Sequence, residues 1–206
     1  AVDARIADAA RSSGRRPEEI TRIVVTKFHP ARLVERLYEL DVRDVGENRQ
    51  QELSAKHDEV GPLADLRWHF IGQAQTNKAR AIRSAASVVH SVDRPKIADA
   101  LDRAAEESEP TLDVFLQVNL TDDPGRGGVA PGELIPLAEH AARLLVGEEA
   151  HDEVPLGRAA EVMISWSAVI IIASMFFMST APRPQSMPSL MTPAKGSTVQ
   201  LAGSAG

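Results

Sequence analysis

The sequence contains no cysteine among its 206 residues. Disulfide bonds, thiolate catalysis and cysteine-ligated zinc sites are therefore excluded. A chain without cysteine is common in the reducing cytoplasm, and its first residues carry no secretory signal pattern. We therefore expect a cytoplasmic protein.

An excess of positive charge is also absent, because the formal net charge is −6 and the pI is about 5.5. Such a chain has no general electrostatic affinity for nucleic acid or for anionic membranes. Its 43% hydrophobic and 25% charged residues are typical of a globular protein. We expect residues 1–206 to form one domain, with 147–206 less regular in pattern, and the protein to be a monomer.

Paired catalytic side chains are missing as well. The six histidines are scattered, and none has metal-binding spacing to another. Glu47 has no partner carboxylate of the kind that glycoside hydrolysis requires, and no Ser-His-Asp arrangement is evident. The sequence therefore gives no indication of metal-dependent, glycosidase or serine-hydrolase chemistry.

One long uncharged run is present, at residues 162–182. Its length approaches that of a membrane span, but serines interrupt it and five amphipathic units precede it. We predict buried strands and a helix in this segment. A membrane-anchored or interaction protein is the alternative.

Strand and helix patterns alternate five times after an opening helix, which predicts an α/β protein with a parallel sheet and right-handed crossovers. Asp93 is expected to cap the fifth helix, with Pro95 in its first turn. The predicted strands are residues 23–27, 44–48, 67–72, 87–92 and 112–120, and the predicted helices are 2–11, 31–40, 49–60, 76–84, 93–108 and 133–146.

Two architectures fit this alternation: an open doubly wound sheet and a closed (β/α)8 barrel of the TIM type. The chain is short for a barrel, whose usual length is roughly 250 residues. However, no glycine-rich dinucleotide-binding motif follows the first strand, where an open nucleotide-binding sheet would require it. We therefore favour the barrel, with an irregular C-terminal part.

The first predicted strand ends at Lys27, and His29-Pro30 stops it because proline cannot continue a strand ladder. Parallel strands covered on both faces are usually apolar throughout, so a lysine at the strand end is unusual. Desolvation lowers the pKa of a lysine, and a neutral amine can attack a carbonyl to form a Schiff base. A solvated or salt-bridged lysine is the alternative from position alone.

Barrels gather their functional residues at the carboxyl ends of the strands and often bind phosphate near the last two strands. Residues 196–198 and 203–204 offer backbone N–H groups and hydroxyls for a phosphate, although a flexible Gly/Ser tail has the same composition. A lysine amine and a phosphate site in one barrel together indicate pyridoxal phosphate.

Five motifs in the first 146 residues resemble those of one family. The most specific is Trp68-His69-Phe70-Ile71-Gly72-Gln73-Ala74-Gln75-Thr76-Asn77-Lys78, and the others are residues 25–27, 45–52, 90–93 and 117–119. On these motifs the chain resembles the pyridoxal phosphate homeostasis proteins, which are single-domain relatives of the alanine racemase barrel. The resemblance covers residues 3–146.

The resemblance implies roles for individual residues. Lys27 would hold pyridoxal phosphate as a Schiff base, and Asn48 would lie beside the cofactor ring. Ser186, Gly203 and Ser204 are the ungapped matches to the residues that hold the phosphate. The arginine expected near the pyridine nitrogen falls on Leu201, or on Gln200 with a gap, and proline stands at 188 where the family has an acid.

The family likeness implies a protein that holds, buffers or delivers the cofactor to apo-enzymes in vitamin B6 homeostasis. The alternative is a pyridoxal-phosphate-dependent racemase or a related α-carbon enzyme. Such an enzyme needs an acid/base group on each face of the cofactor, and the chain has one tyrosine, Tyr38, in the helix after the first strand. We therefore expect a carrier rather than an enzyme.

Overall fold

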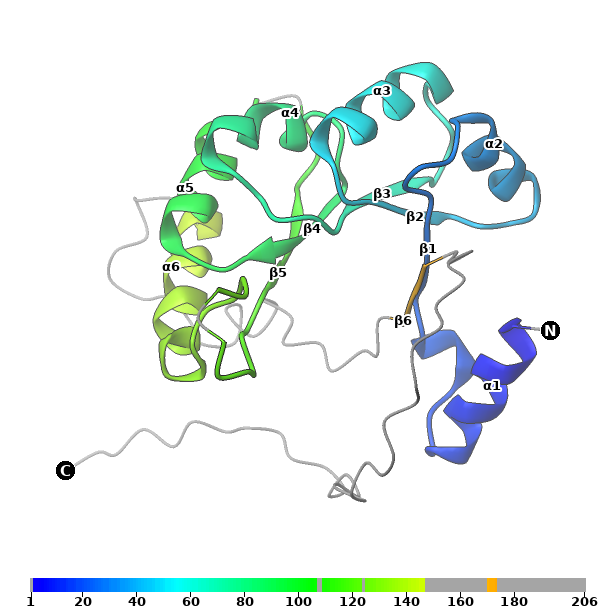
Figure 1. Ribbon diagram of the computed structural model, residues 1–206, viewed down its shortest axis with the longest axis horizontal. Coiled ribbons are helices and arrows are strands. Elements are labelled where there is room, and N and C mark those ends of the chain that lie inside the picture. Colours follow the sequence, from blue (N-terminus) through cyan, green and yellow to red (C-terminus); the bar gives the residue numbers. More distant parts are fainter. Residues whose placement is uncertain (1, 107–108, 124, 147–169, 174–206) are drawn as a thin grey trace. The chain divides into compact units, whose positions relative to one another are not determined.

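The computed structural model describes residues 2–106, 109–123, 125–146 and 170–173 (Figure 1). All of them belong to the first of two compact units, Ala1–Ser174 and Met175–Gly206. The strands are β1 Arg22–Val25, β2 Asp44–Glu47, β3 Arg67–Phe70, β4 Val88–Val92, β5 Asp113–Leu116 and β6 Ile170–Ala173. The α-helices are α1 Val2–Ser12, α2 Arg32–Glu39, α3 Gln50–Val60, α4 Ala79–Arg83, α5 Pro95–Arg103 and α6 Leu134–Val146. Short 3-10 helices are η1 Pro17–Glu19, η2 Thr76–Lys78 and η3 Pro131–Glu133.

The strands form one parallel sheet in the order β5-β4-β3-β2-β1-β6. Strands that follow one another from β1 to β5 are neighbours, and the order never reverses among them. Right-handed crossovers in such a sheet carry every helix to the same face, whereas a doubly wound sheet reverses its order and covers both faces. Figure 1 shows α2 to α6 along one side of these strands. The prediction of an α/β protein with a parallel sheet is confirmed, and the strand order is not that of a doubly wound sheet.

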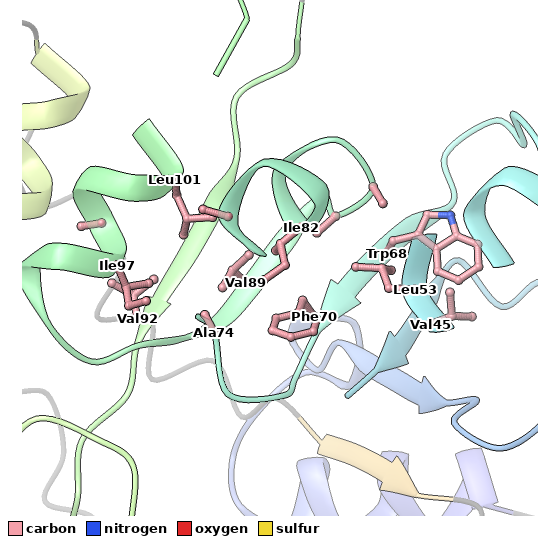
Figure 2. Packing of buried hydrophobic residues seen from close by; sticks show 14 of the residues in the cluster. Val45, Leu53, Trp68, Phe70, Ala74, Ile82, Val89, Val92, Ile97 and Leu101 are labelled. Carbon is pink, nitrogen blue, oxygen red and sulfur yellow. The ribbon is translucent and has the colours of Figure 1, made fainter. Parts of the chain in front are cut away.

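The main hydrophobic core lies between the sheet and the helices (Figure 2). Val45, Trp68 and Phe70 contribute strand side chains that are at most 4% exposed. They belong to one cluster with helix residues such as Leu53 and Ile82. Because side chains alternate along a strand, every second position joins this core. Trp68 and Phe70, both part of the most specific motif, are therefore core residues.

The opposite face of the sheet carries the intervening residues. Ile23 and Val25 are buried on this face, and a Cβ built on Gly46 would lie 3.2 Å from Ile23 and 3.6 Å from Val25. The same alternation assigns Lys27 and Asn48 to this face, just beyond the ends of β1 and β2. This face, opposite α2 to α6, therefore leads to the predicted site.

The predicted strands and helices recur with shifted boundaries, and one predicted cap is wrong. The residue before α5 is Arg94, without a side-chain capping bond, although Pro95 does occupy the first turn. Asp93 instead accepts hydrogen bonds from Gln73 Nε2 at 2.7 Å and from the Gly128 N–H at 3.4 Å. Its carboxylate thus joins two loops rather than the helix end.

The segment at residues 162–182 contributes β6, which pairs with β1. The strand prediction for this segment is confirmed at residues 170–173, and the rest of it lies outside the described residues. Among the described helices, none combines the length and the apolar character needed to cross a membrane.

Candidate functional site

Lys27 lies in a tight turn immediately after β1. The Thr26 N–H donates to the Gly46 carbonyl at 3.0 Å, which extends the β1–β2 ladder, and the His29 N–H donates to the Thr26 carbonyl at 3.1 Å. Lys27 and Phe28 are therefore the two central residues of a β-turn. Lys27 is half-buried at the carboxyl edge of the sheet, with its Nζ 5.7 Å from the centroid of the Phe28 ring.

Phe28 adopts a left-handed backbone conformation, with φ of +67°. A turn in which the third residue alone has positive φ has the type II pattern, which favours glycine at that position. An L-residue with a Cβ there costs roughly 1–2 kcal/mol. The Phe28 side chain is 68% exposed, so its own burial does not offset this strain. Strain of this kind persists where surrounding contacts enforce it, commonly at functional sites.

Asn48 occupies the corresponding position after β2. The Ile71 N–H donates to the Glu47 carbonyl at 2.9 Å, so the ladder to β3 also continues past the strand end. Val25 pairs with Gly46, and Lys27 and Asn48 each lie two residues beyond this pair, after the carboxyl ends of β1 and β2. The Asn48 Oδ1 is buried and has no hydrogen-bond partner in the described part of the chain. It can accept a hydrogen bond from a ligand donor beside the lysine.

Gly72 approaches the Asn48 backbone closely. A Cβ at position 72 would lie 1.9 Å from the Asn48 carbonyl oxygen and 2.7 Å from its carbonyl carbon. No side chain fits at that distance, so glycine is required there by space. The β3 end therefore packs directly on the loop that carries Asn48.

A buried charged cluster lies on the helix side of the Lys27 turn. Glu47 is fully buried, and its Oε1 accepts from Thr26 Oγ1 at 2.6 Å and from Lys56 Nζ at 2.6 Å. Lys56, 7% exposed, also donates to the Thr26 carbonyl at 2.8 Å. One helical turn earlier in α3, Glu52 Oε2 accepts from the Phe28 N–H at 3.1 Å. Two α3 side chains therefore hold the backbone of the turn.

Sequence reasoning did not identify Lys56 and Glu52 as part of the site. Residues 49–60 were predicted as a polar helix, and a polar pattern does not reveal which charges are buried. The available signal was the spacing, since Glu52 and Lys56 are four residues apart and share a helix face. This shared helix face, together with Glu47 at the end of the preceding strand, could have indicated an ion pair between Glu47 and Lys56.

A second group of hydrogen-bonded polar side chains crosses the sheet face opposite α2 to α6. It lies nearer the amino ends of the strands. His69 Nε2 lies 2.8 Å from Asp44 Oδ1, and His69 Nδ1 lies 2.9 Å from His90 Nε2. His90 stacks on Phe115 with ring centroids 4.8 Å apart. Burial, followed by the positive charges of His69 and Arg67, lowers the pKa of His90 from 6.5 to about 4. Both ring nitrogens of His69 therefore have hydrogen-bond partners within the protein.

The described residues bring together only part of the predicted site. Lys27 and Asn48 each follow the carboxyl end of one of two neighbouring strands, β1 and β2, whereas Ser186, Gly203 and Ser204 lie outside the described residues. Two features of this edge suit pyridoxal phosphate. The Lys27 amine suits its aldehyde, and the unpartnered amide oxygen of Asn48, on the loop packed against Gly72, suits its ring. Its phosphate seat stays a prediction. No group of three metal-ligating side chains is present in the residues searched.

The chain has clear relatives. Residues 5–148 match the family described as alanine racemase, N-terminal domain. A pyridoxal phosphate homeostasis protein of Pseudomonas aeruginosa is 42% identical over 143 residues, 69% of this chain and 62% of that protein. One of Corynebacterium glutamicum is 42% identical over 146 residues, 67% of this chain and 64% of that protein.

A solved structure is similar too. PipY of Synechococcus elongatus, with PLP bound, has a TM-score of 0.54 and 37% identity, covering 65% of this chain and 64% of that one. This chain spans slightly less than two thirds of the curated relatives, at 62% and 64% of their lengths.

Proposed function

The chain belongs to the family of the alanine racemase N-terminal domain, and we propose on that premise that it binds pyridoxal phosphate through a Schiff base at Lys27. In this proposal it holds the cofactor and releases it to apo-enzymes, as a monomer in the cytoplasm. The names of its relatives and the PLP bound to PipY support the choice of cofactor.

The observation that carries the proposal is the placement of two residues after the carboxyl ends of neighbouring strands. Lys27 offers an amine on a strained turn, and the neighbouring Asn48 offers a buried amide oxygen without a partner. The cofactor supplies an aldehyde, which condenses reversibly with a lysine amine and releases one water. In this proposal Asn48 contacts the ring, and Ser186, Gly203 and Ser204 hold the phosphate.

The position of Tyr38 supports a carrier rather than a racemase. Its hydroxyl donates to the Ala64 carbonyl at 3.0 Å, and the Arg43 guanidinium lies 4.2 Å from its ring centroid. Ala64 and Arg43 precede β3 and β2, so this tyrosine lies near the amino ends of the strands, away from the edge with Lys27. The chain has no other tyrosine that could serve as the acid/base group of a racemase.

A visible absorption spectrum tests the proposal. When pyridoxal phosphate is added, the protein should turn yellow, and borohydride should bleach the colour by reducing the C=N bond. Lys27→Ala should abolish the band, whereas Lys96→Ala, an exposed lysine on α5, should retain it. An unchanged band in Lys27→Ala would refute the proposed link.

The racemase alternative is tested by exchange of the α-hydrogen of alanine in deuterated water. A carrier should show exchange far below the typical enzyme turnover of 1–1000 per second, at about the rate of free cofactor. Exchange at an ordinary enzymatic rate would contradict the carrier function while leaving the Lys27 link intact.

A further inference from the structure

The turn that presents Lys27 is stabilised mainly by contacts from neighbouring elements. Phe28 has φ of +67° and an exposed side chain, so neither its backbone preference nor its burial favours the observed conformation. Inside the turn, the His29 N–H to Thr26 carbonyl contact is a single hydrogen bond. The remaining contacts to its backbone come from α3 and β2.

Two α3 side chains bond to successive peptide groups of the turn. Lys56 Nζ donates to the Thr26 carbonyl, which belongs to the peptide bond preceding Lys27. Glu52 Oε2 accepts from the N–H of the peptide bond that follows Lys27. The backbone on both sides of the lysine is therefore fixed by charged side chains from one helix.

The surroundings of Lys56 prevent its own amine from reacting with the cofactor. It is 7% exposed, and its ammonium is bonded to Glu47 at 2.6 Å and to the Thr26 carbonyl at 2.8 Å. A buried ion pair adds little net stability compared with apolar residues of similar volume, and it is known to specify conformation in some proteins. The conformation specified here is the turn at Lys27.

We propose that Lys56, paired with Glu47, is a positioning residue for Lys27: it holds the Thr26–His29 turn in the conformation that presents the amine. Glu52 assists by fixing the Phe28 N–H. This inference rests on the proposed function, because the orientation of the Lys27 amine is measured through its binding of the cofactor. Lys56 acts through the turn and does not touch the cofactor.

The test compares cofactor affinity among full-length variants by absorbance titration with pyridoxal phosphate. Lys56→Met alone leaves Glu47 buried without a cation and is expected to fold poorly. The informative variant is therefore Glu47→Gln with Lys56→Met, which removes both charges together. It should fold, as judged by circular dichroism, and bind the cofactor about 10- to 100-fold more weakly. Lys96→Met is the matched control and should bind normally.

Glycine at position 28 provides the second, specific readout. Glycine adopts positive φ without strain, so the turn should form without help from α3. Adding Phe28→Gly to the Glu47→Gln, Lys56→Met variant should restore most of the lost affinity. Because glycine also removes backbone strain from the folded state, the free energy of unfolding is measured in parallel. Recovery of affinity at matched stability supports the positioning role, and failure of the rescue would overturn it.

Hydrogen exchange gives a readout that needs no cofactor. The Phe28 amide, which donates to Glu52, should exchange faster in the Glu47→Gln, Lys56→Met variant than in the unmodified protein. If that variant shows normal cofactor affinity and unchanged exchange, the positioning role of Lys56 is refuted, while the proposed function is unaffected. If the unmodified protein fails to bind the cofactor, the proposed function fails instead, and the exchange result still decides the positioning role.

Discussion

At the scale of single residues, the site combines positions that have little freedom to change. Phe28 holds a left-handed conformation beside the proposed reactive lysine, and Gly72 leaves no space for a side chain. The sequence predicted that Lys27 lies at the end of a strand, and the structure places it directly after β1. It could not predict the φ of Phe28, because aromatic residues rarely adopt that conformation and no local pattern signals it.

Gly72 gives a direct prediction about packing. Gly72→Ala would place a methyl group 1.9 Å from the Asn48 carbonyl oxygen, a backbone atom that cannot move aside cheaply. We expect the free energy of unfolding in urea to fall by about 1–3 kcal/mol. Gly132→Ala is the matched control, since no atom lies within 4 Å of its added Cβ. Equal stability of the two variants would contradict the close packing.

His90 predicts a dependence of stability on pH. The folded protein keeps His90 neutral down to a pKa of about 4, whereas the unfolded chain protonates it near 6.5. Between these values the unfolded state binds more protons, so stability falls as the pH drops through that window. Burial is the largest cause of the lowered pKa of His90, and the charges of His69 and Arg67 on β3 lower it further. Asp44 on β2 is bonded to His69.

The measurement is urea unfolding at several pH values. Lowering the pH from roughly 7 to 5 should cost about 1–2 kcal/mol through His90. The His90→Gln variant cannot titrate at this position. Over the same pH range its free energy of unfolding should therefore fall by about 1–2 kcal/mol less than that of the unmodified protein. If both proteins show the same slope, His90 is not held neutral in the folded state.

At the scale of elements, α3 connects the core to the site. Its apolar residue Leu53 is fully buried in the cluster with Trp68 and Phe70 (Figure 2), while Glu52 and Lys56 hold the Lys27 turn. The alternation of strands and helices was predictable because apolar periodicity reports which face of an element is buried. The burial of charged α3 residues was not, since it depends on a neighbouring strand supplying the counter-charge.

Truncation of Leu53 tests this coupling. Leu53→Ala removes a fully buried side chain and should lower the free energy of unfolding by about 2–5 kcal/mol. Because the same helix carries Lys56, cofactor affinity should fall as well. Leu40→Ala, at a side chain 67% exposed, should change stability by less than about 0.5 kcal/mol. Loss of stability without loss of affinity would show that α3 does not support the turn.

At the scale of the whole molecule, the parallel sheet and its order follow from a repeated pattern. Five strand–helix units add strands in one direction from β1 to β5, and the parallel pairing brings the carboxyl ends of the strands to one edge. This pattern predicted that Lys27 and Asn48 would both follow strands at the carboxyl edge of the sheet, and both do. The Asp93 cap was wrong because a carboxylate that can cap a helix can also accept from neighbouring loops, as Asp93 does from Gln73. The phosphate residues at 186, 203 and 204 stay predictions.

The central claim is tested most directly by locating the attachment point. The protein is mixed with pyridoxal phosphate and reduced with borohydride, and its peptides are analysed by mass spectrometry. We predict one pyridoxyl group on the peptide that contains Lys27, with Lys56 unmodified because it is buried and bonded. Unmodified Lys27 together with a stoichiometric label on another lysine would contradict the account.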